Sequence, residues 1–313
     1  MQSYPFKQVD VFTGTPYCGN PLAVVMNVGE ALLESDMQRF AKWTNLSETT
    51  FLLSPTDASA DYSVRIFTPG AELPFAGHPT LGSCHAWLQA GGKPRSKDFI
   101  VQECKVGLIK IRYVPGIAGA PDRLAFAAPP LKRTAPSPLL VAQVTAALGL
   151  KAGQVTAAQM LDNGPVWLGL LLDSPESVLS LIPSNLELEK VGIKVGVAAL
   201  YLKEAAPALI GRANREAQAF GSTPAAAAAT ENPDIEVRAF APCIGINEDP
   251  VTGSLNASLA QWLMADGYAP ERYVASQGVC LGRAGLVHLE RDASGQVWVG
   301  GESVTCIDGS VTL

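Results

Sequence analysis

Three side chains that can exchange protons stand beside turns in this sequence: Glu48, His78 and Asp249. Glu48 precedes the apolar segment 51–53, so it is either a solvated turn residue, as most glutamates are, or a partly desolvated acid/base group. His78 and Asp249 each precede a proline. Extended backbone before proline would turn the imidazole away from a following helix, and the aspartate could cap one. In one cleft, the three would form a proton-handling cluster.

The histidines and cysteines do not follow a metal-binding pattern. His78 and His85 are too far apart in sequence for the i, i+4 spacing of a helical zinc site. The cysteines contain no CxxC pair, which predicts neither a zinc cluster nor a disulfide framework, but mostly buried, reduced thiols. They are Cys18, Cys84, Cys104, Cys243, Cys280 and Cys306. We therefore expect no metal site.

Length and charge restrict the class of protein. A chain of 313 residues favours two domains or one large α/β domain. The net charge of -6, without a Lys/Arg-rich run, argues against binding nucleic acid. Residues 1–12 lack the apolar core of a signal peptide, and no run of about 20 apolar residues could span a membrane. These features predict a soluble, cytoplasmic protein.

Two distant segments share a spaced pattern. They read VRIFTPGAELPFAGHPTLGSCHAWL from Val64 and VRAFAPCIGINEDPVTGSLNASL from Val237. The alignment begins at these two valines. Further along it pairs Pro79 with Pro250, which places His78 opposite Asp249. Two convergent strand-turn-helix units remain an alternative, but so many ordered matches favour a duplication.

Each copy predicts a strand, a Pro/Gly-rich turn and an apolar helix. In this alignment the pairs Gly82–Ser83 and Gly253–Ser254 stand at or near the helix starts, where unpaired N–H groups can hold a carboxylate. If the copies are related by a pseudo-twofold axis, both helix starts can face one interdomain cleft. That cleft would be the active site.

Proline-rich residues 127–138 suit a linker, with an N-terminal domain over 1–130 and a C-terminal domain over 131–313. The last C-terminal strand is expected to join the N-terminal domain. Ser137 is a predicted cap for the next helix. The alanine-rich stretch 221–229 predicts a surface loop or short helix, and 285–313 predicts strands around a turn.

The chain resembles the phenazine-biosynthesis-like PhzF family over nearly its whole length. The similarity rests on the ordered motifs GNPLAVV, NLSETTF, FAGHPT, DNGPVWLGL and EDPVTGS. It implies an α/β (α+β) protein with two pseudo-twofold-related domains of the diaminopimelate-epimerase-like fold, each a curled sheet around a central helix. The internal repeat agrees with that fold.

The resemblance also implies a chemistry. It points to a cofactor-independent isomerase, in which Glu48 moves a proton between carbons of a small carboxylate-bearing metabolite. In the phenazine enzyme the substrate is a dihydro-hydroxyanthranilate. The matching His78 and Asp249 would assist catalysis, and a homodimer is expected. The implied substrate-binding residues are Asn20, Gly77, Gly253 and Ser254.

Two other functions stay open. Diaminopimelate epimerases and proline racemases, which share this fold, use two cysteines. In the proline racemases one cysteine precedes Gly-His, where this chain has Ala76, and the turn 249–253 contains no cysteine. A racemase or epimerase of an amino or hydroxy acid is therefore disfavoured. The third possibility is a metabolite-binding protein that retains the cleft without turnover.

Overall fold

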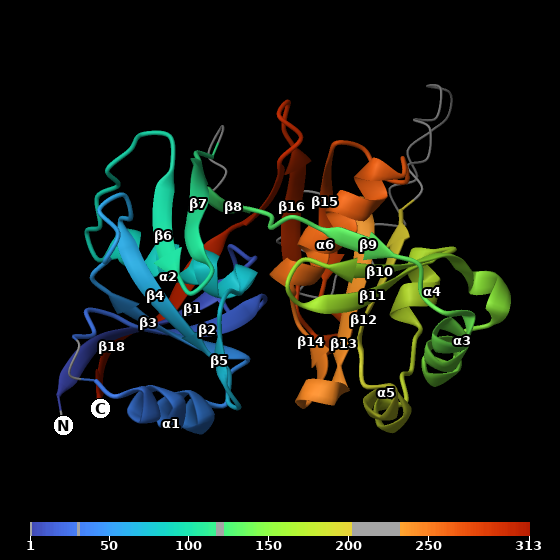
Figure 1. Ribbon diagram of the computed structural model, residues 1–313, viewed down its shortest axis with the longest axis horizontal. Helices are drawn as coiled ribbons and strands as arrows, with labels where there is room; N and C mark the ends of the chain where they lie inside the picture. Colours follow the sequence, from blue (N-terminus) through green and yellow to red (C-terminus); the bar gives the residue numbers. More distant parts are fainter. Residues whose placement is uncertain (1, 30–31, 117–121, 202–231) are drawn as a thin grey trace, which may run out of the picture.

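The computed structural model describes residues 2–29, 32–116, 122–201 and 232–313, apart from the side chain of residue 152. The alanine-rich stretch 221–229 lies outside the described residues. Figure 1 shows two lobes side by side, each with a curved sheet folded around a helix. The predicted mixed α/β architecture of two similar halves is confirmed.

The N-terminal lobe folds one curled sheet around helix α2. Its sheet order is β18, β1, β2, β3, β4, β6, β7 and β8, with the short β5 also paired to β4. Helix α1 contacts β3 and β4. The elements are β1 (Ser3–Val11), β2 (Asn20–Val25), α1 (Glu34–Thr44), β3 (Glu48–Leu53), β4 (Tyr62–Phe67), β5 (Glu72–Leu73), α2 (Gly77–Gln89), β6 (Ile100–Cys104), β7 (Gly107–Val114), β8 (Arg123–Ala127) and β18 (Ser303–Thr312).

The C-terminal lobe repeats this order around helix α6. The sequence β9, β10, β11, β12, β13, β15, β16, β17 follows the same parallel and antiparallel pairings, and β14 takes the place of β5. Its elements are β9 (Lys132–Thr134), α3 (Pro138–Ala147), η1 (Ala152–Gln154), β10 (Val155–Asp162), β11 (Val166–Leu172), α4 (Pro175–Leu179), α5 (Asn185–Val191), β12 (Lys194–Leu200), β13 (Ile235–Ala241), η3 (Pro242–Ile244), β14 (Ile246–Asp249), α6 (Gly253–Ala265), β15 (Arg272–Gln277), η4 (Val279–Leu281), β16 (Gly285–Arg291) and β17 (Val297–Gly301).

The last strand of the chain belongs to the sheet of the first lobe. After β8 the chain crosses to pair β9 with β10, and after β17 it crosses back to pair β18 with β1 over their full lengths. Strands β8 and β17 also pair with each other, so the two sheets form one continuous 18-stranded sheet. The last strand therefore joins the N-terminal lobe, while the domain boundary near residue 130 stays a prediction.

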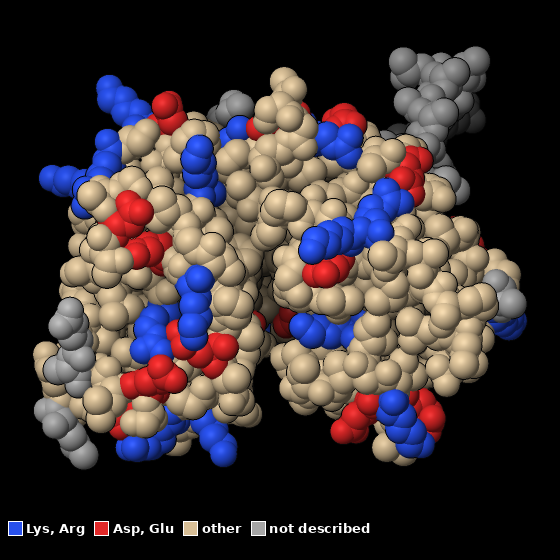
Figure 2. Space-filling model, in the orientation of Figure 1, with Lys and Arg blue, Asp and Glu red and all other residues tan. Residues whose placement is uncertain are grey.

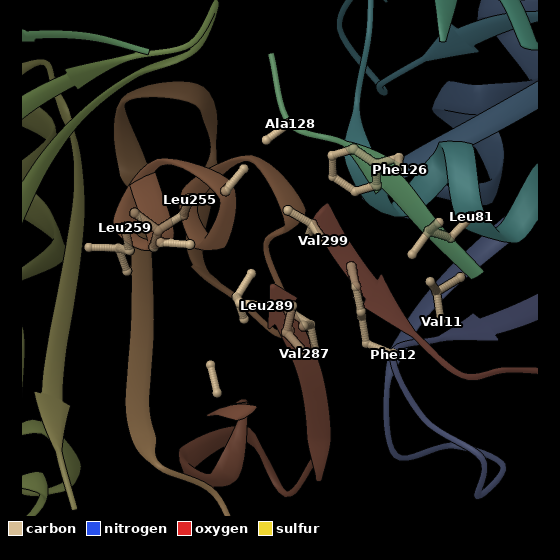
Figure 3. Packing of buried hydrophobic residues seen from close by; sticks show 14 of the residues in the cluster. Val11, Phe12, Leu81, Phe126, Ala128, Leu255, Leu259, Val287, Leu289 and Val299 are labelled. Carbon is tan, nitrogen blue, oxygen red and sulfur yellow. The ribbon is translucent and has the colours of Figure 1, made fainter. Parts of the chain in front are cut away.

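One apolar core reaches through both lobes. Helices α2 and α6 are buried over most of their surfaces because strands surround them. Figure 3 shows Leu81 and Phe126 on one side and Leu255 and Leu259 on the other, with Val299 of β17 between them. The burial of this continuous apolar surface stabilises the lobes as a unit.

The structure corrects the predicted alignment of the repeat. Arg65 forms a two-pronged ion pair with Glu72 (2.8 and 2.9 Å) and lies over the Phe67 ring, and Arg238 does the same with Glu248 (2.9 and 2.8 Å) and Phe240. The equivalent turns are therefore ELPFAGH and EDPVTGS. The match between the two strands is confirmed, but the matches predicted beyond it are wrong.

In the corrected register, Gly77 is equivalent to Gly253, since each begins a helix of 13 residues. Pro79 lies inside α2, whereas Pro250 precedes α6, so this predicted pair is wrong. His78 is likewise helical rather than extended, because a proline in the first turn of a helix removes no intrahelical hydrogen bond. A three-residue insertion, in the region of η3, had hidden the Glu-x-Pro-x-x-Gly match.

Two further local predictions have mixed outcomes. The predicted Gly82–Ser83 helix start is wrong, because both residues lie in the buried middle of α2, where the Ser83 hydroxyl donates to Thr50 Oγ1 (2.9 Å). Ser137 caps α3 as predicted by accepting from the Leu140 N–H (3.2 Å). No helix among the described residues is long and apolar enough to cross a membrane.

The thiols are free, as predicted, but mostly not buried. Cys84 is buried in α2, Cys280 is exposed, and the other four are half-buried. Their scattered positions at strand and loop surfaces explain the difference, because a small side chain is tolerated in either environment.

Candidate functional site

The starts of α2 and α6 meet at the junction of the lobes. A Cβ atom on Gly253 would lie 3.1 Å from the Gly77 Cα, and one on Gly77 would lie 2.6 Å from Cζ of Phe126. Glycine fits best at these two positions, because a side chain would crowd the backbone at Gly253 and the packed Phe126 ring at Gly77. The pseudo-twofold axis therefore passes between two helix N-termini in contact.

This contact concentrates hydrogen-bond donors. The first N–H groups of an α-helix have no partner within the helix, and the helix dipole makes this end electropositive. Among the described residues, no hydrogen bond occupies the N–H groups of Gly77, His78, Gly253 or Ser254. Two donor sets from different lobes thus converge on one small region, where they could bind an anionic group.

Glu48 is the first residue of β3 and lies next to this region. Its side chain is 15% exposed, and its Oε2 lies 3.4 Å from Nδ1 of His78 on α2. Burial, together with the negative charge of Asp249, raises the pKa of Glu48 to about 8, against an opposing effect of Lys194. Glu48 is therefore a partly desolvated carboxyl group rather than a solvated turn residue.

The His78 ring is neutral in this environment. Burial lowers the pKa of His78 to about 3, and the Pro21 backbone opposes the shift only weakly. Its Nε2 is buried without a hydrogen-bond partner in the described part of the chain. The ring therefore contacts Glu48 as a neutral imidazole and has one nitrogen free.

Asp249 ends β14 and reaches across the lobe junction. Its Oδ1 accepts from the Asn20 amide on β2 (3.1 Å), and its Oδ2 accepts from the Thr252 hydroxyl (2.6 Å). Burial raises the pKa of Asp249 to about 6, although these two hydrogen bonds and the charge of Lys194 act in the opposite direction. Asn20 also donates to the Val251 carbonyl (2.9 Å), which ties the N-terminal lobe to the entrance of α6.

A buried amide network that the sequence analysis missed holds this turn. Gln277 of β15 donates to the Asp249 carbonyl (3.0 Å) and accepts from the Thr252 N–H (3.0 Å). Asn256 of α6 donates to Gln277 Oε1 (2.8 Å) and to the Thr252 carbonyl (3.0 Å). Gln277 opens the segment QGVCLGR, which also resembles the PhzF family and was a usable signal. Nothing in the sequence pointed to Asn256.

The structure thus brings together residues from both lobes that the sequence had singled out. Glu48 contacts His78, Asn20 binds Asp249, and Gly77 touches Gly253, which Ser254 follows. Figure 2 shows the surface hollowed between the lobes, with acidic atoms visible inside the hollow. The described residues contain no group of three or more metal-ligating side chains close enough to hold an ion.

Comparison with known proteins identifies the family. The profile of the phenazine biosynthesis-like proteins, PhzC–PhzF, matches residues 9–309. The chain belongs to this family. A PhzF-family protein of Bacillus anthracis has the same fold, with a TM-score of 0.77 at 20% identity over 100% of both chains.

Two curated relatives carry different names. "Antisense-enhancing sequence 1" of Schizosaccharomyces pombe is 34% identical over 99% of both chains. The trans-2,3-dihydro-3-hydroxyanthranilate isomerase of Pseudomonas aeruginosa is 43% identical over 101 residues, which cover 32% of this chain and 34% of the relative. Membership of the family and its fold were therefore both predicted correctly.

Proposed function

We propose that this PhzF-family isomerase is cofactor-independent and that Glu48 transfers a proton between two carbons of a small carboxylate-bearing metabolite. The observation that carries the proposal is the partly buried Glu48 carboxyl, with a pKa raised to about 8, beside neutral His78. An unperturbed carboxylate, with a pKa of about 4.3, is a weak base for a carbon-bound proton. Desolvation strengthens it as a base.

The proposed reaction balances without a co-reactant. The Glu48 carboxylate takes a proton from one carbon, and the C–H electron pair shifts into the adjacent unsaturated system of the substrate. Donors at Gly77, Gly253 and Ser254 stabilise the charge that develops. Glu48 then returns the proton to a second carbon, so the product is an isomer of the substrate.

His78 and Asp249 have assisting roles in this proposal. The unpartnered Nε2 of His78 is available to the substrate, and Asp249 is held by Asn20 and Thr252. Asn20 would bind substrate through its Oδ1, which is also without a partner in the described residues. The candidate substrate is trans-2,3-dihydro-3-hydroxyanthranilate, named for the relative from Pseudomonas aeruginosa.

Two-thiol racemase chemistry has no support at this site. The residues that precede the two helix starts are Ala76 and Thr252. Cys84 is buried in the core, and burial raises the pKa of its thiol far above the usual range. Cys243 lies in η3, and strand β14 separates it in the sequence from the start of α6. The homodimer and the cytoplasmic location stay predictions.

The test is proton exchange in D2O with the candidate substrate, followed by NMR. We expect wild-type protein to form an isomer that carries deuterium. Glu48→Gln should lose about 10⁴-fold in turnover and keep its fold, because glutamine preserves size but cannot accept and return a proton. Replacing His78 or Asp249 should cost less.

The matched control is Glu187→Gln, an exposed change on α5, which should leave turnover unchanged. Wild-type turnover and exchange in the Glu48→Gln protein would refute the assignment and direct attention to Asp249 as the base. Binding of the substrate by wild-type protein without exchange would support a metabolite-binding protein instead.

A further inference from the structure

Lys194 occupies the position in the C-terminal lobe that Glu48 occupies in the N-terminal lobe. Glu48 begins β3 and Lys194 begins β12, and the residue after each pairs with the phenylalanine of the repeated Arg-x-Phe strand. The pseudo-twofold axis between the helix starts therefore relates an acid/base group on one side to a cation on the other.

The Lys194 side chain is half-buried and has no anionic partner among the residues that the structure describes. Its Nζ lies 5.5 Å from the centre of the Trp167 ring, on the neighbouring strand β11. Within the described ranges it forms neither a hydrogen bond nor an ion pair, although its charge acts on both Glu48 and Asp249. Lys194 is thus close enough to influence both carboxyl groups but too far away to form an ion pair with either one.

Two further polar side chains, Trp167 beside Lys194 and Asn163 in the turn before β11, each have a buried atom without a hydrogen-bond partner among the described residues. Trp167 is 3% exposed, and its Nε1 is buried without a partner in the described residues. Asn163 donates to the Ser254 carbonyl at the start of α6 (3.0 Å), and its buried Oδ1 has no partner either. Leaving buried polar groups unpaired costs free energy, so such a group of residues is expected where a ligand completes the hydrogen bonds.

We propose that Lys194, backed by Trp167, binds the carboxylate of the substrate and makes the site selective for anionic over neutral ring compounds. This inference rests on the proposed function and assigns the cation for its substrate. Cation–π contact with Trp167 holds the ammonium group in place, and partial burial strengthens its attraction for an anion. The carboxylate then lies between Lys194 and the helix starts, with Glu48 facing the ring.

The experiment compares two probes that differ in charge, anthranilate and its neutral amide, anthranilamide, by isothermal titration calorimetry. We expect wild-type protein to prefer anthranilate by about 10–100-fold, the range for a hydrogen bond to a charged group. Lys194→Met should remove most of this preference by weakening anthranilate alone. Lys194→Arg should restore part of it, and Lys194→Gln serves as a second neutral variant if the methionine protein does not fold.

Lys132→Met, an exposed lysine of β9, is the matched control and should retain the wild-type preference. A wild-type protein without preference for anthranilate, or a Lys194→Met protein that keeps it, overturns the inference. Glu48→Gln should bind both probes as wild type does. If wild-type protein prefers anthranilate but exchanges no proton, the proposed function alone is wrong. If it exchanges protons but its preference for anthranilate does not depend on Lys194, this inference alone is wrong.

Discussion

At the scale of residues, the site depends on carboxyl groups that share one environment. Glu48 and Asp249 are both half-buried, and the negative charge of Asp249 makes ionisation of Glu48 harder. A glutamate with a pKa of about 8 is mostly protonated at neutral pH, so its proton must leave before it can act as a base. The positive charge of Lys194 makes that step easier.

We therefore predict that kcat/KM for proton abstraction rises with pH and levels off above about pH 8, where Glu48 is ionised. Asp249→Asn removes a negative neighbour, lowers the pKa of Glu48 and should shift this rise to lower pH. Lys194→Met removes a positive neighbour and should shift it to higher pH. Rates measured between pH 5 and 10 check all three profiles; shifts of the same sign in both variants would contradict the coupling.

The sequence could identify these residues but not their environment. Glu48 precedes an apolar strand, and that position alone favoured exposure; its side chain is nevertheless only 15% exposed and lies against His78 of α2. Lys194 carried no motif at all. Its relation to Glu48 emerges only when the two strands are compared in space, because the repeat matches at β4 and β13 but not at β3 and β12.

At the scale of elements, two helices of 13 residues meet end to end at a pair of glycines. The sequence predicted the helices and their burial, since Leu255, Leu259 and Leu263 recur at helical spacing. The sequence-based prediction misplaced the start of α2, because the Gly-Ser pair five residues inside that helix resembles the Gly-Ser pair that begins α6. Sequence spacing could not reveal which glycines touch, because the contact is between lobes.

Gly253→Ala should therefore reduce both stability and activity. The added methyl would lie 3.1 Å from the Gly77 Cα and 3.2 Å from the backbone nitrogen of His78. These backbone atoms cannot move aside as the end of a side chain can. Overpacking of this kind typically lowers the free energy of unfolding by about 1–3 kcal/mol. Denaturant unfolding and the exchange assay measure the two effects.

Gly309→Ala is the control for that change, because a Cβ on Gly309 meets no atom within 4 Å. It should unfold like wild type. If the Gly253→Ala protein keeps wild-type stability and activity, the lobes separate more readily than the contact between the two glycines indicates.

At the scale of the whole molecule, each lobe completes its sheet with a strand that follows the other lobe. A chain that ends at residue 301 loses β18 and should be strongly destabilised, because β1 then has only one of its two neighbours. Adding the separate peptide 302–313 should restore stability. Thermal unfolding with and without the peptide measures this, and a shortened chain as stable as wild type would contradict it.

A rearranged chain provides the control for the peptide experiment. Leu313 and Gln2 exchange two backbone hydrogen bonds (2.7 and 3.0 Å), so the two ends of the chain lie together. Placing residues 302–313 before residue 1 would turn β18 and β1 into a hairpin and should give a folded protein.

The same pairing sets the timing of assembly during protein synthesis. Ser3 leaves the ribosome well before its partner Thr312, because the whole C-terminal lobe lies between them in the sequence. The outer edge of β1 must therefore stay unpaired until β18 has been synthesised, and an open strand edge is prone to aggregate. We expect the nascent chain to complete its first lobe only after the C-terminal lobe has been synthesised, and to need chaperones more than its compact final form would indicate.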